Sequence, residues 1–227
     1  MCGRYSFVPT KKQIDTQLAD LERPAELKLS FNIAPTQQGY VVANDAPGLL
    51  QAMTWGLVPH WSRDGANGGK LINARAEGIE EKPSFRDPIR RRHCLVWADS
   101  FYEWRKLPGG RKVPYRILPA DGSLLCFAGI WDEWRQPDGK KLRSFSIITT
   151  TPNRELGGLH DRMPVLLTNE AEQQRWLSEQ SLEATLDMLH PPADAYLRLY
   201  PVSDRVNSPA HDGPDLHEEV ADTPTLF

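Results

Sequence analysis

A series of strand-like runs separated by turn residues constrains the fold of this chain most strongly. The runs are rich in apolar, β-branched and aromatic residues and cover residues 93–104, 113–118, 124–131 and 145–151. The stretches between them contain Pro108-Gly109-Gly110, Asp121-Gly122 and Pro137-Asp138-Gly139. Turns with glycine at such positions favour β-hairpins, in which neighbouring strands pair antiparallel. The series therefore predicts an α+β domain built on a large, mainly antiparallel sheet system.

Shorter elements flank this series. Further strands are expected at residues 39–44, 49–56, 71–75 and 197–202. The spacing of apolar residues predicts helices at residues 11–21, 169–177 and 182–189. Thr10 is suited to cap the first of these helices, and Pro35 indicates a turn over residues 31–36 because proline lacks a backbone donor.

The extent of the domain follows from where the pattern ends. The chain shows no internal repeat and no linker, so residues 1–207 are expected to form a single domain. After Asn207 the sequence becomes polar and is interrupted by proline. Residues 208–227 are therefore expected to form a loosely ordered tail.

Composition limits the classes of protein to consider. The chain has 227 residues, of which 40% are hydrophobic, enough to bury a core. Its net charge is −3, so any nucleic-acid binding needs a local basic patch. Cys2, Cys94 and Cys126 lie far apart, which argues against a disulfide framework and a zinc site, and no metal or cofactor is expected. Without a membrane span or a signal-peptide core, the protein is expected to be soluble, reduced and cytoplasmic.

The first four residues, Met1-Cys2-Gly3-Arg4, carry the most specific chemistry. A small second residue permits removal of Met1, which would give Cys2 a free α-amine (pKa ~7.7–8.0) beside a thiol (pKa ~8.5), and a nearby cation would favour the thiolate. Such a 1,2-aminothiol condenses with an aldehyde to a Schiff base, and the thiol then closes a thiazolidine ring. A buried structural cysteine is the alternative, and the tetrapeptide alone leaves both open.

Three other stretches combine polar side chains in ways that suit a site. Asn73 and Arg75 alternate along a short strand and share a face, where an amide can orient a nucleophile and a guanidinium can hold a phosphate. Glu103 lies among aromatic residues, which disfavours its charged form and suits a general acid. His160 and Arg162 follow two glycines and could move protons and bind phosphate. A solvated strand edge, an outward carboxylate and a surface loop are the respective structural alternatives.

Six motifs occur in an order that closely resembles the SRAP (SOS-response-associated peptidase) family, which includes abasic-site-sensing proteins of bacteria and vertebrates. They are Met1-Cys2-Gly3-Arg4, Phe31-Asn32-Ile33-Ala34-Pro35, Trp55-Gly56-Leu57-Val58-Pro59, Ile72-Asn73-Ala74-Arg75, Trp97-Ala98-Asp99-Ser100-Phe101-Tyr102-Glu103-Trp104 and His160-Asp161-Arg162-Met163-Pro164. The resemblance runs from residue 1 to about residue 207. The loop over residues 61–70 looks longer and richer in glycine than is usual in the family.

The resemblance implies a fold and an activity. The fold would be a single domain of mainly antiparallel sheets in a barrel-like arrangement flanked by short helices. The activity would be covalent capture of the ring-opened aldehyde of an abasic site in single-stranded DNA. Cys2 would form the thiazolidine, Asn73 would orient the amine and the sugar, Glu103 would protonate the ring oxygen, and His160 would move protons.

The resemblance also implies how DNA is held and what else the site does. Phosphates would be bound by Arg4, Arg75 and Arg162, while Pro35, Trp61 and Trp104 would stack on or wedge bases beside Asn32. Schiff-base chemistry would bring an abasic-site lyase activity, and the peptidase name suggests self-removal of residues ahead of Cys2. The expected partner is single-stranded DNA containing abasic sites, bound by a cytoplasmic, nucleoid-associated monomer.

Three other functions stay open on the sequence alone. An N-terminal-nucleophile glutamine amidotransferase also begins Met-Cys-Gly, but those enzymes continue with apolar residues where this chain has Arg4. A non-catalytic single-strand-binding module would bind DNA with an inert Cys2. A peptidase acting on other proteins is the third. The self-labelling interpretation expects the mature terminus to lie exposed in a positively lined groove beside an amide, an acid and an imidazole.

Overall fold

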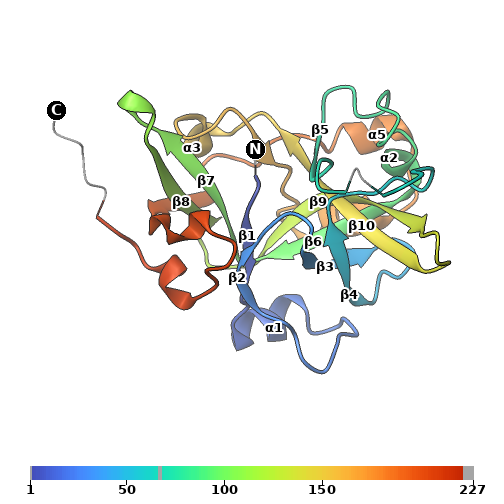
Figure 1. The fold of residues 1–227 in the computed structure, drawn as a ribbon, viewed down its shortest axis with the longest axis horizontal. Helices are drawn as coiled ribbons and strands as arrows, with labels where there is room; N and C mark the ends of the chain where they lie inside the picture. The colour runs from blue at the N-terminus through green and yellow to red at the C-terminus, as the bar shows by residue number, and fades with distance from the viewer. Residues whose placement is uncertain (1, 66–67, 222–227) are drawn as a thin grey trace.

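Five strands close into a barrel in the computed structural model, which describes residues 2–65 and 68–221 (Figure 1). The barrel strands are β3 (Gln38–Ala43), β4 (Leu50–Trp55), β6 (His93–Ala98), β9 (Leu125–Arg135) and β10 (Lys141–Thr150). Their order is β10-β4-β3-β6-β9, and β9 pairs back with β10. Each pair is antiparallel except β4 with β10. The predicted barrel-like, mainly antiparallel arrangement is thus confirmed.

Two short strands lengthen the barrel wall on either side of β10. The strand β5 (Asn73–Arg75) pairs with it in parallel, beyond the end of β4, and β11 (Met163–Pro164) pairs antiparallel at its carboxyl end. These two strands carry or adjoin the predicted site residues.

A second sheet lies beside the barrel and shares β1 with the core. Its five strands follow the order β12-β8-β7-β1-β2, all antiparallel. They are β1 (Tyr5–Phe7), β2 (Ser30–Ile33), β7 (Ser100–Lys106), β8 (Lys112–Pro119) and β12 (Leu197–Pro201). In Figure 1 the long β7–β8 pair stands at the left and the barrel at the right, with β1 running between them.

Aromatic packing joins the two sheets. The ring of Tyr5 meets those of Trp55 and Phe127 edge-on, with centroids 5.0 and 6.0 Å apart. A side chain at Gly39 would collide with the hydroxyl of Tyr5, so glycine is needed there for β1 to approach the barrel. Such edge-to-face contacts between fully buried rings hold the N-terminal strand in a fixed place.

Short helices cover the ends of the sheets. They are α1 (Lys11–Gln17), α2 (Pro88–Arg91), α3 (Arg154–Gly157), α4 (Glu170–Leu177) and α5 (Leu182–Leu186), with 3₁₀ turns η1 (Pro108–Gly110), η2 (Asp204–Asn207) and η3 (Pro214–His217). Thr10 caps α1 as predicted, through a reciprocal capping box with Gln13. None of the helices in the described residues is long and apolar enough to cross a membrane.

The sequence located the strands but misjudged some of their pairings. Asp121-Gly122 does form a turn, yet the strands on either side, β8 and β9, belong to different sheets and make no hairpin. The predicted run over residues 93–104 is likewise divided between the sheets at Asp99. The buried carboxylate of Asp99 accepts hydrogen bonds from Ser6 and Arg116 of the second sheet, which draws the chain out of the barrel.

Two further expectations are corrected. Residues 31–33 lie in β2 rather than in a turn, which begins after Ile33 where Gln37 N–H donates to Ala34 O. The segment after residue 207 packs against the body as far as residue 221: Leu216 is fully buried against Tyr102, and Val220 N–H donates to Pro201 O at 3.0 Å. The sequence of this segment has no alternation of apolar residues that would predict its packing, because single side chains such as Leu216 make the contacts. Residues 222–227 lie outside the described part.

Candidate active site

The nucleophile candidate and the predicted amide are in direct contact. Cys2 lies three residues before the start of β1, and Asn73 begins β5, where it pairs with Ile147 of β10. Asn73 Nδ2 donates to the carbonyl oxygen of Cys2 at 2.7 Å. Its Oδ1 is buried and has no hydrogen-bond partner within the described ranges, so one acceptor is left next to the start of the chain. The amide therefore fixes the Cys2 peptide group.

Cys2 lies deeper and is less acidic than the sequence suggests. Its exposed fraction is 0%. In the chain that still carries Met1, the expectation of an exposed Cys2 is therefore contradicted. Burial, and next the charge of the Glu103 carboxylate, raise the pKa of the Cys2 thiol far above its ordinary value. The expectation that a nearby cation supplies thiolate is not supported, because burial and the Glu103 carboxylate outweigh the effects that lower the pKa of the thiol. The thiol is protonated at neutral pH and needs a base before it can attack.

Glu103 has the environment that its sequence context predicts. It lies on β7, and its side chain is 2% exposed. Burial raises the pKa of Glu103 to about 7. A carboxyl group with this pKa is present in both protonation states at neutral pH, so it can give a proton in one step and take one in another. The backbone N–H of Tyr102, the residue before Glu103, donates to Arg4 O at 2.9 Å, so Glu103 lies beside the N-terminal segment that contains Cys2.

His160 lies next to Glu103. Its Nε2 is 4.0 Å from Glu103 Oε2, and its Nδ1 lies 3.0 Å from the backbone nitrogen of Arg162 and 2.8 Å from Asp161 Oδ1. The ring therefore has polar partners at both nitrogens and can move protons between them. Burial lowers the pKa of His160, although the Asp161 carboxylate opposes this from 2.8 Å. The imidazole is therefore neutral near pH 7.

The two arginines expected to bind phosphate differ in availability. Arg75 follows Asn73 on β5 and its side chain is exposed, opposite Thr149 of β10. Arg162 instead makes a two-point ion pair with Glu77, with N–O distances of 2.6 and 2.8 Å, and also donates to Thr149 O at 2.5 Å. A phosphate would have to compete with Glu77 for Arg162. Sequence reasoning missed Glu77, although it follows the Asn73–Arg75 pair by two residues.

Arg4 and Asn32 are bound to a distant part of the chain. Arg4 Nη1 donates to Asn32 Oδ1 and to Val206 O, both at 2.7 Å. Asn32 is 1% exposed and donates through Nδ2 to Ser208 O at 3.0 Å and His211 O at 2.7 Å. In this arrangement Asn32 offers DNA no exposed group, and its direct DNA contact is not supported. Nothing in the sequence signals the carbonyl groups of residues 206–211 as partners.

The side chains expected to stack on bases come from different segments of the chain and differ in their exposure. Trp61 is 49% exposed, and Pro35 is half-buried in the turn after β2. Trp104 is also half-buried and donates from Nε1 to Asn207 Oδ1 at 2.8 Å. Ser62, near the start of the loop over residues 61–70, lies against the barrel, since Trp134 Nε1 donates to Ser62 O. Residues 66–67 of that loop lie outside the described part, and the DNA contacts of these residues stay predictions.

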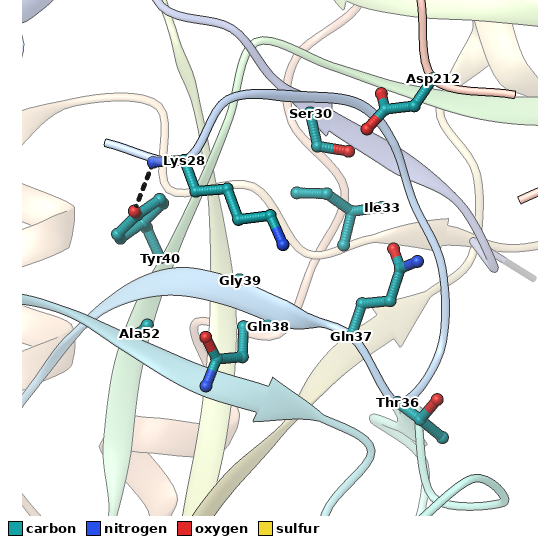
Figure 2. A pocket seen from close by; sticks show the side chains of 10 residues that line it. All are labelled: Lys28, Ser30, Ile33, Thr36, Gln37, Gln38, Gly39, Tyr40, Ala52 and Asp212. Carbon is teal, nitrogen blue, oxygen red and sulfur yellow. Dashed lines mark hydrogen bonds between the residues drawn. The ribbon is translucent and has the colours of Figure 1, made fainter. Parts of the chain in front are cut away.

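A cavity of about 320 Å³ opens near β2 and β3, away from the reactive groups. Figure 2 shows its lining, in which Lys28, Gln37 and Asp212 point inward over the buried Ile33. None of the four predicted catalytic residues lines it. The cavity is therefore not part of the candidate active site.

The described residues contain no group of three or more His, Cys, Asp or Glu side chains that could hold a metal ion. The three cysteines are all buried and unpaired as disulfides. The Asn73 amide on the Cys2 peptide can provide orientation, and the adjacent Glu103 and His160 side chains can provide a proton donor and a proton acceptor.

This fold and site define a class of proteins whose second residue is a cysteine held between a barrel and a flanking sheet. The chain belongs to the SRAP family: the family model described as SOS response associated peptidase matches residues 1–209. The predicted family is thereby confirmed, and a glutamine amidotransferase is not supported.

Relatives and solved structures agree with this assignment. The chain is 41% identical over 223 residues to the abasic site processing protein YoqW of Bacillus subtilis, covering 96% of this chain and 99% of the relative. It is 31% identical to the abasic site processing protein HMCES of Rattus norvegicus, covering 95% and 75% of the two chains. A crystal structure of a Bacteroides thetaiotaomicron protein superposes with a TM-score of 0.86 at 26% identity, over 96% of this chain and all of that one.

Proposed function

We propose that this protein captures abasic sites in single-stranded DNA as a covalent thiazolidine on Cys2. The observation that carries the proposal is the contact of Asn73 with the Cys2 peptide beside a carboxyl group whose pKa is about 7. Relatives named abasic site processing proteins support the substrate. Removal of Met1 converts the Cys2 nitrogen from an amide into an amine, and this step creates the nucleophile.

The first step forms a Schiff base. Protonated Glu103 gives its proton to the ring oxygen of the closed sugar, which opens to the aldehyde as the C1′ hydroxyl loses a proton. The neutral Cys2 amine adds to the aldehyde carbon, and water leaves as the iminium forms. Asn73 orients the Cys2 residue, so the amine approaches within a fixed geometry.

The second step closes the ring. Because the Cys2 thiol is protonated, its attack on the iminium carbon requires a base. Glu103, now a carboxylate, is suited to take that proton, and neutral His160 can relay it. The carbon–sulfur bond forms as the iminium becomes an amine, and the sum of both steps is aldehyde plus aminothiol giving thiazolidine plus one water.

The same intermediate explains a lyase side reaction. The iminium acidifies the hydrogens on the neighbouring sugar carbon, so loss of one of them would expel the 3′ phosphate by β-elimination. Rapid thiol attack removes the iminium and competes with strand cleavage. Peptidase activity is proposed only for the release of residues ahead of Cys2, which the capture chemistry requires.

Intact mass spectrometry after incubation with abasic single-stranded DNA tests the proposal. The expected product lacks Met1 and has the mass of protein plus DNA minus one water. Cys2→Ala should abolish the stable adduct yet leave much of the DNA affinity, since phosphate contacts carry most of it. Cys2→Ser should form only a labile Schiff base that borohydride traps.

Two results would overturn the proposal. An adduct of the Cys2→Ala variant that survives a denaturing gel would assign the chemistry to another residue. Salt-sensitive binding without any covalent product, with log affinity falling by ~0.7 per phosphate contact per log unit of salt, would identify a non-catalytic binding module.

A further inference from the structure

The C-terminal strap, defined as residues 203–220, contacts both the N-terminal segment that contains Cys2 and the strand β7 that carries Glu103. It follows β12, contains η2 and η3, and curls beside β8 at the lower left of Figure 1. Its apolar residues Val206 and Leu216 are fully buried. The strap is thus packed into the fold beside β7 and β1.

On the side of the nucleophile the strap holds Arg4. Arg4 donates from Nη1 to Val206 O at 2.7 Å and from Nη2 to Asn207 O at 3.4 Å. The backbone carbonyl of Arg4 in turn lies 3.8 Å from the sulfur of Cys2, as the acceptor of its thiol. The position of Arg4 therefore bears directly on the orientation of the Cys2 side chain.

On the side of the acid the strap holds the two neighbours of Glu103. Trp104 Nε1 donates to Asn207 Oδ1 at 2.8 Å. Tyr102 packs in a buried cluster with Val206 and Leu216, and its backbone N–H donates to Arg4 O at 2.9 Å. Glu103 lies between these residues, so its backbone is fixed from both sides.

We propose that Asn207 is a positioning residue of the capture reaction, which sets the placement of Cys2 relative to Glu103. It contacts Arg4, in the segment that contains Cys2, with its backbone carbonyl, and Trp104, on the strand that carries Glu103, with its side chain. The inference rests on the proposed function of the site. Asn207 touches neither reactive group itself and acts through Arg4 and Trp104.

Other contacts anchor the strap independently of the Asn207 side chain. Asp212 Oδ1 accepts from the Phe31 N–H at 2.5 Å, and Figure 2 shows Asp212 next to Ser30 at the edge of β2. His217 packs edge-on against Phe31, with ring centroids 4.8 Å apart. Loss of the Asn207 amide should therefore leave the strap docked and the protein folded.

Three full-length variants test the inference. Asn207→Ala removes the acceptor for Trp104, whereas Asn207→Asp keeps an oxygen at that position. Asp204→Ala changes an exposed residue of the same turn and serves as the matched control. The measurements are the single-turnover capture rate at saturating abasic single-stranded DNA, the affinity for a DNA carrying the unreactive tetrahydrofuran analogue, and the thermal unfolding midpoint.

Asn207→Ala is expected to capture about tenfold more slowly at saturating DNA, because a small misplacement of reacting groups costs rate rather than binding. Its affinity for the analogue and its unfolding midpoint should match the wild type, and Asn207→Asp should restore the rate. A wild-type protein that forms no adduct would overturn the proposed function and this inference with it. If the wild type captures DNA, the inference alone fails when Asn207→Ala keeps the full rate, when only its affinity falls, or when a folded Asn207→Asp is equally slow.

Discussion

Arg162 and Glu77 form a two-point ion pair that occupies the guanidinium group proposed to bind phosphate. Glu77 is exposed, and the pair lowers the pKa of its carboxyl group, so it is charged at neutral pH. A DNA phosphate arriving at Arg162 meets this carboxylate as a competitor. On the proposed function, the ion pair therefore opposes phosphate binding while it holds the arginine in place.

Glu77→Gln should strengthen binding to single-stranded DNA. The variant releases Arg162, which stays oriented by its hydrogen bond to Thr149 O. An exposed ion pair is worth up to about 1 kcal/mol, so we expect affinity for tetrahydrofuran-containing DNA to rise by up to roughly fivefold. Fluorescence anisotropy at fixed salt measures this. Glu179→Gln, exposed and on the helix-rich side, removes the same charge and should change little. Equal or weaker binding by Glu77→Gln would show that the ion pair serves to preorganise Arg162.

Glu103→Gln should slow capture and change its pH dependence. The wild-type acid is protonated below its pKa of about 7, so its contribution to ring opening should decline as the pH rises past that value. Glutamine does not act as a general acid, and we expect the capture rate to fall by about a hundredfold. The decline of the rate with rising pH near pH 7 should also disappear in this variant. Rapid-quench capture assays from pH 5 to 9 check this. A variant whose DNA affinity falls as much as its rate would point to a structural role.

The same substitution should stabilise the folded protein at alkaline pH. The carboxyl pKa is about 7 in the fold and ~4.3 in the unfolded chain. Between these values the folded state keeps a proton that the unfolded state has released, so stability falls as the pH rises towards 7. Glu103→Gln has no ionisable group at this position, so its stability does not fall in this way as the pH rises. Its unfolding midpoint should exceed that of the wild type at pH 8, and the difference should shrink at pH 5. A difference that does not vary with pH would contradict the raised pKa.

Strand positions were predictable because alternation and turn residues are local signals, but strand partners were not. Asp121-Gly122 correctly predicted a turn, whereas a local motif cannot show that β8 and β9 then join different sheets. The deciding contacts belong to Asp99, whose partner Arg116 is 17 residues away. Pairing across such distances depends on the packed structure as a whole.

The site was predictable where its chemistry is carried by single residues. The sequence brought together Cys2, Asn73, Glu103 and His160 through motif order, and the structure brings Asn73 to Cys2 and His160 to Glu103. The sequence did not predict how the surrounding charges affect the ionisation of the Cys2 thiol. Whether the thiol ionises depends on burial and on Glu103, neither of which is visible in the tetrapeptide that contains it.

The residues expected to bind DNA were the least predictable. Arg4 and Asn32 have the right chemistry for phosphate and base contacts, but they bind carbonyl groups more than 170 residues away in sequence. A polar segment broken by proline gave no sign that its backbone supplies those acceptors. Polar side chains are satisfied by whichever partner the fold brings near, and composition does not identify that partner.

Asn73 supplies the last prediction, since the hydrogen bond from its side chain to Cys2 O distinguishes two substitutions. Asn73→Ala removes the donor and should loosen the Cys2 peptide. Asn73→Asp also removes it, and in addition places a carboxylate oxygen against the carbonyl oxygen 2.7 Å away. The added negative charge also disfavours ionisation of Glu103, which must accept the thiol proton. We expect capture to fall about tenfold for Ala and on the order of a hundredfold for Asp.

Single-turnover capture at saturating DNA ranks the two Asn73 variants, with affinity for the tetrahydrofuran analogue as the control for binding. Asn44→Asp provides a matched amide-to-acid change far from the reactive groups, because Asn44 bonds Arg91 O and Trp131 on the barrel. It should leave the capture rate unaltered. If Asn73→Asp were as fast as Asn73→Ala, the charge beside Cys2 would not matter, and orientation by the amide would be the whole contribution of this residue.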